Sequence, residues 1–311
     1  MNFHHIPVML NEVTAYLNLQ PDRTYIDCTL GGGGHTEKII EKILPGGRVF
    51  GIDQDPNALA AASKRLAQYE ANIVYVHSNF YRLKDVITEY DIGEVDGVLF
   101  DLGVSSHQLD EGDRGFSYKQ DAPLDMRMNP EDVVTAAKLV NNLDEYQLTK
   151  IIKDYGEERW AKRIAQFIVE LRKNQPIRTT SELVTVIKKA IPAGARREGP
   201  HPAKRTFQAL RIAVNDELNR FAQTLKDAVD ILKPGGRVCV ISFHSLEDRI
   251  TKDVFKELAR SCICPPELPV CRCDKQKIVK IITGKPVLPG VEELSHNPRA
   301  RSAKLRVAQK M

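Results

Sequence analysis

The chain of 311 residues lacks any apolar run approaching the roughly 18 residues that a membrane-spanning helix needs. Its better apolar runs, such as Val238 to Phe243, have the length of a β-strand. The N-terminal residues also lack the charged segment followed by an apolar segment that marks a secretory signal. These absences exclude an integral membrane protein and predict a reducing, cytoplasmic location.

Cysteine is scarce, with six residues, whereas glycine and proline occur 19 and 17 times. Hydrophobic residues make up 42% of the chain and charged residues 28%, which excludes a disordered, collagen-like or disulfide-stapled chain. The formal net charge of +4 is too small to identify a binding partner by itself. At roughly 150 residues per domain, the length predicts two domains, or one large core with an insertion.

Short β-branched runs alternate with amphipathic stretches in the N-terminal third, a pattern that predicts βαβ units and a parallel sheet. The expected strands are 24–27, 48–53, 73–76 and 97–100; the first two end in polar residues, and polar residues directly follow the other two. Parallel strands place their carboxyl ends at one edge of a sheet, so these polar residues are expected to lie near one another.

Helical periodicity replaces the strand pattern in the middle of the chain, at 144–155, 157–172 and 180–191, the last helix with Thr179 or Thr180 as its N-cap. One long helix is expected from Thr206 to Leu232, before a strand that runs from Arg237 to Phe243. A further helix at 246–260 and a hairpin of 277–283 with 303–307 are expected to end the chain.

These elements predict an α/β fold in which the core is interrupted by an all-helical insertion. Residues 1–104 begin the core, residues 105–205 form the insertion, and residues 206–311 complete the core and include a Cys-rich loop at 261–274.

A glycine tract, Asp27-Cys-Thr-Leu-Gly31-Gly-Gly33-Gly34-His35, follows the first expected strand, where a doubly wound sheet binds its nucleotide. The dinucleotide fingerprint G-x-G-x-x-G requires glycine or alanine where this chain has Thr36 or Glu37, so that fingerprint fails. The spacing Asp27-x-x-x-Gly31-x-Gly33 instead resembles the pattern of S-adenosylmethionine (SAM) methyltransferases. SAM carries a sulfonium cation, which carboxylates favour, whereas the pyrophosphate of a dinucleotide suits a helix N-terminus.

Three further residues at strand ends suit a nucleoside ligand. Asp53 ends the second strand and suits a contact to ribose hydroxyls, which both dinucleotides and SAM possess. Phe80 follows the third strand and suits an adenine face, and Asp101 ends the fourth and suits the sulfonium or the methyl acceptor. The alternatives are structural: a turn or cap for each acid, and a core position for Phe80.

Basic residues gather in two stretches of the sequence. Residues 188–211 contain seven basic residues and one acidic residue, and residues 299–311 contain five basic residues and no acidic residue. The first stretch provides the candidates for binding an RNA backbone, which are Arg196, Arg197, His201, Lys204 and Arg205. A solvated basic surface without a ligand is the alternative.

Four of the cysteines form the spacing Cys262-x-Cys264-x6-Cys271-x-Cys273. Four thiols at this separation suit a tetrahedral metal such as zinc, although the usual knuckle spacing is C-x2-C. A reduced loop without metal and a redox disulfide remain open as alternatives. Cys28 and Cys239 lie in expected strands and are interpreted as buried apolar thiols.

Nine blocks of sequence that extend nearly from end to end carry a more specific resemblance. They are His4-His-Ile-Pro-Val-Met-Leu-Asn-Glu12, Tyr25-Ile-Asp-Cys-Thr-Leu-Gly-Gly-Gly-Gly-His35, Asp101-Leu-Gly-Val-Ser-Ser106, Arg114-Gly-Phe-Ser117, Leu124-Asp-Met-Arg-Met128, Tyr155-Gly-Glu-Glu158, Phe207-Gln-Ala-Leu-Arg-Ile212, Ser242-Phe-His-Ser-Leu-Glu-Asp-Arg249 and Asn297-Pro-Arg-Ala-Arg-Ser302. Together these blocks resemble the MraW family, the family of ribosomal RNA small subunit methyltransferase H.

The resemblance implies a Rossmann-like class I SAM methyltransferase sheet whose inserted helical domain faces RNA. It implies an enzyme that methylates the exocyclic N4 of one cytidine in the decoding region of 16S rRNA, within the small ribosomal subunit. It also implies the residues that contact SAM, which are Gly33, Gly34, His35, Asp53, Phe80, Asp101 and Gln108. The family more often has proline at the position of His107, which precedes Gln108 here.

The chemistry needs an acceptor for a hydrogen of the cytosine amine, because its nitrogen lone pair is delocalised into the ring. Asp101 is the first candidate, and Ser242 and His244, at the end of the fifth expected strand, are further candidates for catalysis. His244 is alternatively a structural histidine. Two other functions stay open, a nucleotide-dependent oxidoreductase and a non-catalytic RNA-binding module, and so does a homodimer.

Overall fold

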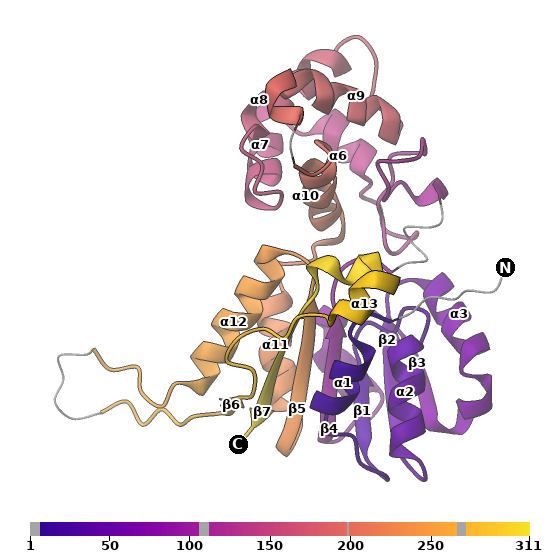
Figure 1. Cartoon of the computed structure of the whole chain (residues 1–311), viewed down its shortest axis with the longest axis vertical. Helices are drawn as coiled ribbons and strands as arrows, with labels where there is room; N and C mark the ends of the chain where they lie inside the picture. Colours follow the sequence, from indigo (N-terminus) through magenta and orange to yellow (C-terminus); the bar gives the residue numbers. More distant parts are fainter. Residues whose placement is uncertain (1–6, 106–111, 198, 266–271) are drawn as a thin grey trace. The chain divides into compact units, whose positions relative to one another are not determined.

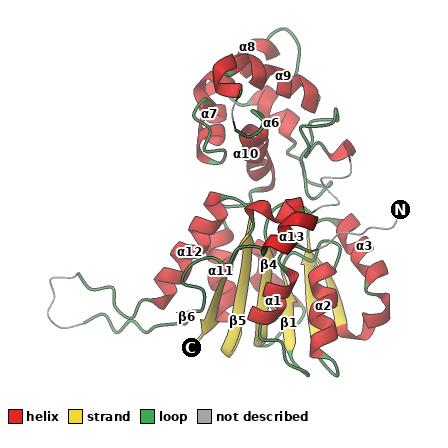
Figure 2. Cartoon of the chain, viewed as in Figure 1, coloured by secondary structure: helices red, strands yellow, loops and turns green. Residues whose placement is uncertain are grey.

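The computed structural model describes residues 7–105, 112–197, 199–265 and 272–311 (Figures 1 and 2). Its internal contacts divide the chain into two units. Unit 1 is formed by two segments, Met1–Gly103 and Leu218–Met311, and unit 2 by Val104–Glu217. None of the described helices combines the length and the apolar character needed to cross a bilayer.

Unit 1 contains a seven-stranded sheet in the order β3-β2-β1-β4-β5-β7-β6. The strands are β1 (Thr24–Asp27), β2 (Arg48–Asp53), β3 (Ile73–His77), β4 (Val95–Asp101), β5 (Leu232–Ser242), β6 (Val279–Ile281) and β7 (Lys304–Lys310). Strands β1 to β5 are parallel, whereas β7 is antiparallel to both β5 and β6. The strand order reverses between β1 and β4, and ligands of open α/β sheets bind outside the carboxyl ends at such a point.

Side chains of the strands alternate between two apolar layers, one on each face of the sheet. Tyr25, Leu99 and Ile241 belong to one layer, and their neighbours Ile26 and Phe100 belong to the other. The first layer is completed by α1 (Leu10–Tyr16), α2 (Gly34–Ile43) and α3 (Pro56–Arg65), of which α1 and α2 lie in front of the strands in Figure 2. The second is completed by α4 (Leu83–Glu89), α11 (Phe221–Asp230) and α12 (Ser245–Ala259). Helix α13 (Val291–His296) lies between β6 and β7 in the sequence.

The fold confirms the α/β class that the sequence predicts, with a Rossmann-like sheet and a helical unit inserted between β4 and β5 in the sequence. All four N-terminal strands occur where the β-branched runs predict them, and the expected terminal hairpin is the β6–β7 pair. Their registers place the ends of β1, β2 and β4 at one edge, since Asp27 pairs with Gly51 and with Leu99.

The prediction of one helix from Thr206 to Leu232 is wrong. Two helices, α10 (Lys204–Asn215) and α11, occupy this stretch, and Leu232 is the first residue of β5. Helix α10 ends at Asp216, whose φ of 50° is left-handed. The division between the units also falls here, at Leu218, whereas the prediction began the second core segment at residue 206. A left-handed residue at a helix end is common but is usually glycine, so an aspartate there gave no signal in the sequence and the apolar periodicity continued past it.

Unit 2 is helical around a core of its own. Its helices are α6 (Ala136–Asn142), α7 (Glu145–Asp154), α8 (Ala161–Arg172), α9 (Thr180–Ala190) and α10. Their apolar stripes meet at residues such as Leu148, Ile164, Leu183 and Leu210, which are all fully buried. The predicted N-cap Thr179 is confirmed: its hydroxyl accepts the N–H of Glu182 in a capping box.

Candidate active site

The carboxyl ends of the parallel strands in unit 1 gather acidic side chains. Asp27 ends β1, Asp53 ends β2 and Asp101 ends β4, and Glu247 follows β5 in the first turn of α12. Burial raises the pKa of Asp27, Asp53 and Asp101. No described basic side chain is paired with Asp27 or Asp53, and the neutral His35 lies beside Asp101. A concentration of negative charge in a poorly solvated position favours a cationic ligand.

The turn from β1 to α2 depends on glycine at specific positions. Gly33 is the N-cap of α2 and has a left-handed φ of 77°, and Gly31 also has a positive φ, of 52°. A Cβ at Gly34 would collide with Pro7. Gly32 differs from these glycines, because it is exposed and a Cβ there would meet no atom within 4 Å. The turn therefore presents an open stretch of backbone at Gly32.

Asp53 holds this turn in place. Its Oδ2 accepts the backbone N–H of Gly31 at 2.7 Å, and its Oδ1 accepts that of Asp55 at 2.9 Å. Burial raises the pKa of Asp53 to about 6 in spite of these two hydrogen bonds. Each carboxylate oxygen retains a lone pair for another donor, such as a ribose hydroxyl.

Asp27 is 1% exposed and belongs to the interior. Its Oδ2 accepts the hydroxyl of Thr36 at 2.7 Å, and its Oδ1 accepts the N–H of Thr29 at 3.1 Å. Burial raises the pKa of Asp27 to about 6. Asp27, the acid of the predicted Asp-x-x-x-Gly pattern, thus connects the end of β1 to the first turn of α2 through its hydrogen bonds.

His35 is buried in the first turn of α2. Its Nε2 lies 2.9 Å from the carbonyl oxygen of Val8, and a carbonyl can only accept, so Nε2 carries the hydrogen. Burial lowers the pKa of His35 to about 4, which leaves the ring neutral near pH 7. The lone pair of Nδ1 then faces Asp101, whose Oδ2 lies 3.6 Å away.

Asp101 is a third acid at this edge whose pKa is raised. Burial raises the pKa of Asp101 well above its usual value, and the nearby charges of Asp27 and Glu247 raise it further. Within the described part of the chain, its buried Oδ1 has no hydrogen-bond partner. Its side chain nevertheless retains 23% of its exposure, so the carboxyl group lies at the margin of the interior. An unpartnered carboxylate oxygen in this position is suited to accept a hydrogen from a ligand.

Ser242 and His244 form the connection from β5 to α12. Ser242 is 2% exposed, and its hydroxyl donates to the carbonyl of Lys304 on β7 at 3.4 Å. His244 is the N-cap of α12, with Nδ1 accepting the N–H of Glu247 at 3.4 Å. Its Nε2 lies 3.0 Å from Oε1 of Glu247 but does not form a hydrogen bond there. Capping α12 is a structural role, as the alternative for His244 holds. A catalytic role for His244 stays a prediction.

Glu247 is the acid that the sequence interpretation missed. It is 1% exposed, and its Oε2 accepts the backbone N–H groups of Phe243, at 2.7 Å, and of His244, at 3.2 Å. A glutamate three residues after a cap residue is the signature of a capping box, so the spacing of His244 and Glu247 contained the signal.

Phe80 follows β3 and is partly buried. Its ring packs edge to face against Phe100, at a centroid distance of 5.9 Å, and against Phe221, at 6.2 Å. These contacts make Phe80 part of the apolar layer, which is the core position expected from the sequence as its alternative role. They also fix the orientation of its ring. Gln108, the remaining predicted cofactor residue, lies outside the described residues.

The predicted RNA-binding residues all belong to unit 2. Arg196 ends a short 3-10 segment and Arg197 follows it, and both are exposed; Lys204 and Arg205 are exposed in the first turn of α10. His201 instead stacks on Tyr118, with ring centroids 4.7 Å apart and an interplanar angle of 6°. Partial burial and then the charge of Lys188 lower the pKa of His201, so this residue contributes little positive charge at neutral pH.

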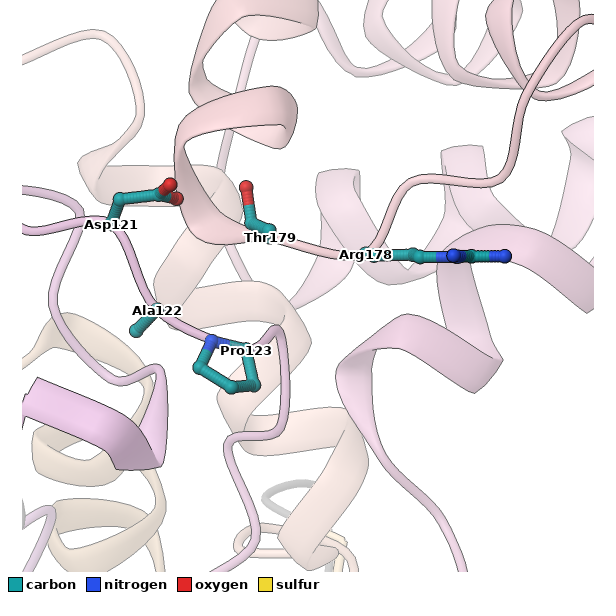
Figure 3. A pocket seen from close by; sticks show the side chains of 5 residues that line it. All are labelled: Asp121, Ala122, Pro123, Arg178 and Thr179. Atoms are coloured by element: carbon teal, nitrogen blue, oxygen red, sulfur yellow. The ribbon is translucent and has the colours of Figure 1, made fainter.

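A surface hollow of about 400 Å³ in unit 2 is lined by Asp121, Ala122, Pro123, Arg178 and Thr179 (Figure 3). Asp121 accepts the N–H of Ser181 at 3.2 Å, and hydrogen bonds from Thr179 and Ser181 lower the pKa of Asp121. In Figure 3 the side chain of Arg178 points away from Asp121. The acid in this hollow is therefore occupied in holding the start of α9, and the arrangement does not resemble a built ligand site.

Three of the four clustered cysteines lie together in unit 1. The Sγ atoms of Cys262, Cys264 and Cys273 are within 4.8 Å of one another, while Cys271 lies outside the described residues. Cys28 and Cys239 are buried, as predicted, and burial raises the pKa of both thiols.

Comparison with known proteins gives a family match over nearly the whole chain. The model of the MraW methylase family matches residues 2–311. The chain is 59% identical over 311 residues to a protein of Clostridioides difficile and 57% identical over 312 residues to one of Heliobacterium modesticaldum; each match covers 100% of both chains. Both relatives are named ribosomal RNA small subunit methyltransferase H.

Solved structures also match at low sequence identity. An rRNA methylase from Streptococcus thermophilus is 10% identical with a TM-score of 0.42, and the match covers 97% of this chain and 93% of the other. A SAM-dependent O-methyltransferase from Thermotoga maritima is 11% identical with a TM-score of 0.42, over 100% of this chain and 69% of the other.

Proposed function

Because this chain belongs to the MraW methylase family, we propose that it methylates the exocyclic N4 of one cytidine in the decoding region of 16S rRNA. The methyl donor is SAM. The names of the relatives support ribosomal RNA of the small subunit as the substrate. Such a substrate would make the cytoplasm the place of action.

The described residues fit SAM. The open backbone at Gly32 allows close approach, and the first turn of α2 offers the N–H groups of Gly34 and His35 to the carboxylate of the amino-acid tail. Asp53 would bind the ribose through the lone pairs that Gly31 and Asp55 leave available. Phe80 would support the adenine with the exposed part of its fixed ring.

The unpartnered Oδ1 of Asp101 is the observation that carries the proposed chemistry. When bound, SAM supplies an electrophilic methyl group on a sulfonium. Asp101 would accept an N–H of the cytosine amine and so direct the nitrogen lone pair in line with that methyl group. The new N–C bond forms as the S–C bond breaks, the departing electron pair stays on sulfur, and Asp101 takes the proton that the amine loses.

Ser242 and His244 would complete the acceptor cradle. The Nε2 of His244 has no hydrogen-bond partner in the described structure, so it is available to a polar group of the base. The hydroxyl of Ser242 is directed to Lys304 across the sheet, which makes Ser242 a residue that positions the end of β5. The roles of Ser242 and His244 are both proposed.

Unit 2 would recognise the RNA through its exposed cations. Arg196, Arg197, Lys204 and Arg205 carry fixed positive charges that neutralise phosphates, and the stacked pair of His201 and Tyr118 supports the same segment. The proposal assigns residues 105–205 to this task.

The test is incubation of the purified protein with methyl-labelled SAM and small ribosomal subunits that have not been methylated, followed by digestion to nucleosides. We expect label in N4-methylcytidine at one position. Asp101→Asn should strongly slow the incorporation of label, and the exposed Asp85→Asn, a matched loss of one carboxylate in the same unit, should retain the wild-type rate. Label on ring carbon, label in another nucleoside, or binding of NAD in place of SAM by calorimetry would each refute the proposal.

A further inference from the structure

The connection between α12 and β6 contains the three clustered thiols. Its described residues, 260–265 and 272–278, form no helix or strand, and this part of the loop extends away from the sheet (Figure 1). Cys262 is exposed, and Cys264 and Cys273 are partly exposed. Cys273 nevertheless lies beside two cysteines that precede it by about ten residues in the sequence.

Each of the three sulfur atoms accepts a backbone N–H group. The N–H of Ile263 lies 3.3 Å from Sγ of Cys273, that of Cys264 lies 3.4 Å from Sγ of Cys262, and that of Arg272 lies 3.3 Å from Sγ of Cys264. A neutral thiol is a weak acceptor, whereas a thiolate accepts such hydrogen bonds well. The backbone is therefore arranged to receive three negatively charged sulfurs.

The separation of the sulfurs fits one metal ion. Sγ of Cys262 lies 3.8 Å from Sγ of Cys273, and all three sulfurs lie within 4.8 Å of one another. Zinc–sulfur bonds of about 2.3 Å at tetrahedral angles place neighbouring sulfurs about 3.8 Å apart. A disulfide requires about 2.05 Å between the sulfurs, and none of these three cysteines is in a disulfide.

The surrounding charge is compatible with a metal thiolate. One divalent ion with three thiolates has a net charge of −1, and the residues beside Cys273 are the basic Arg272 and Lys275 together with the acidic Asp274. A zinc ion would also cross-link the two described ends of this loop, which reduces the entropic cost of ordering a long surface loop.

We propose that Cys262, Cys264 and Cys273 bind one Zn²⁺ that fixes the loop between α12 and β6. The ion replaces the thiol protons, so binding releases up to three protons. The site is structural, lies apart from the acids at the strand ends in the sequence, and does not depend on the proposed function.

The test uses the full-length protein, purified in reducing buffer and stripped of metal by a chelator, and then titrated with Zn²⁺ alone. We expect uptake of about one zinc per chain, with proton release seen in calorimetry across buffers of different ionisation enthalpy. Cobalt substitution should give thiolate-to-metal charge-transfer absorption. The triple variant Cys262→Ser/Cys264→Ser/Cys273→Ser should lose uptake and absorption.

Ile263→Ser is the matched control, because Ile263 is 64% exposed, stands between two of the thiols and keeps its backbone N–H in the variant. It should bind zinc as the wild type does. Trypsin provides a second readout: zinc should slow cleavage after Arg272 and Lys275 at least tenfold in the wild type and not in the triple variant. Equal zinc uptake by the wild type and the triple variant would refute the proposal, as would iron with inorganic sulfide in the purified protein.

Discussion

Nδ1 of His35, in the first turn of α2, lies 3.6 Å from Oδ2 of Asp101 at the end of β4. The carbonyl of Val8 fixes the hydrogen of His35 on the other ring nitrogen, so a lone pair faces the carboxyl group. The neutral ring offers no positive charge to stabilise an ionised Asp101, in agreement with the raised pKa of that carboxyl group. A cation bound beside the pair would supply the missing charge and ionise Asp101.

Asp101→Asn should lower the rate of methyl transfer by about 10²–10⁴-fold, the usual contribution of a positioned base. In the wild type, activity should rise with pH through the raised pKa of Asp101, because only the carboxylate accepts the hydrogen. The measurement is kcat/KM for SAM against pH for both proteins, because this ratio reports the pKa values of the free enzyme. If the asparagine variant has the same pH profile and the same rates as the wild type, Asp101 takes no part in the chemistry. Asp85→Asn is the control for the loss of one negative charge.

His35→Gln should change how stability depends on pH. The pKa of His35 is about 4 in the folded state against 6.5 for the free side chain, so between these values the unfolded chain binds the extra proton. Folded wild type should therefore gain stability over the glutamine variant as pH rises from 4 to 6.5, on the order of 3 kcal/mol. Urea unfolding at several pH values measures this difference. A difference that is constant with pH would show that His35 titrates normally.

The same comparison separates His35 from the buried acids. Asp27 and Asp53 have pKa values raised to about 6, and raised acids lose stability as pH rises from their usual value toward 6. The wild type and His35→Gln both contain these two acids. Their opposite trend therefore cancels when the free energies of unfolding of the two proteins are subtracted.

Gly33→Ala and Gly32→Ala should affect different properties. Alanine at position 33 must adopt a φ of 77° and place its Cβ 3.0 Å from Leu66, so we expect a loss of about 1–3 kcal/mol of stability. Alanine at position 32 meets no atom within 4 Å and should leave the melting temperature nearly unchanged. It should nevertheless weaken SAM binding by about tenfold, or 1.4 kcal/mol, because its methyl group occupies the approach to the backbone. Wild-type affinity in Gly32→Ala would place SAM elsewhere.

Neutralising Arg196 and Arg197 with glutamine should weaken binding to the rRNA and leave SAM affinity unchanged. Each lost phosphate contact should reduce the slope of log K against log salt concentration by about 0.7–0.9. The double variant Lys150→Gln/Lys162→Gln removes two exposed charges from α7 and α8 of the same unit and serves as the control. An equal change of slope in both double variants would mean that the effect is one of general charge.

The strand ends were predictable because they depend on local patterns. Alternating β-branched runs and the residues that follow them located Asp53, Phe80 and Asp101, and the parallel sheet brought their strand ends to one edge. The glycine tract was equally local, since a turn that requires positive φ admits few other residues.

Contacts between distant residues were not predictable from the same patterns. The hydrogen bond of His35 to Val8 and its approach to Asp101 depend on how the N-terminal segment packs over α2. The end of α10 was missed because the helical periodicity of the sequence continues through Asn215. The side chain of Asn215 donates to the carbonyl of Met126 and accepts the N–H of Met128, and the sequence pattern does not show these contacts. Such partners are set by tertiary structure, and a single sequence contains no record of them.

The construction of unit 1 from two separated segments has a consequence for synthesis on the ribosome. Strand β4 is central in the finished sheet, yet its partner β5 is encoded after the whole of unit 2. At 5–20 residues per second, on the order of 10 s pass before β5 emerges. During that interval β4, with Asp101 at its end, is an open edge strand, the kind of surface that pairs with other chains. Unit 2, which has a core of its own, can fold in the meantime, whereas the active-site edge is completed only after β5 and the start of α12 have been made.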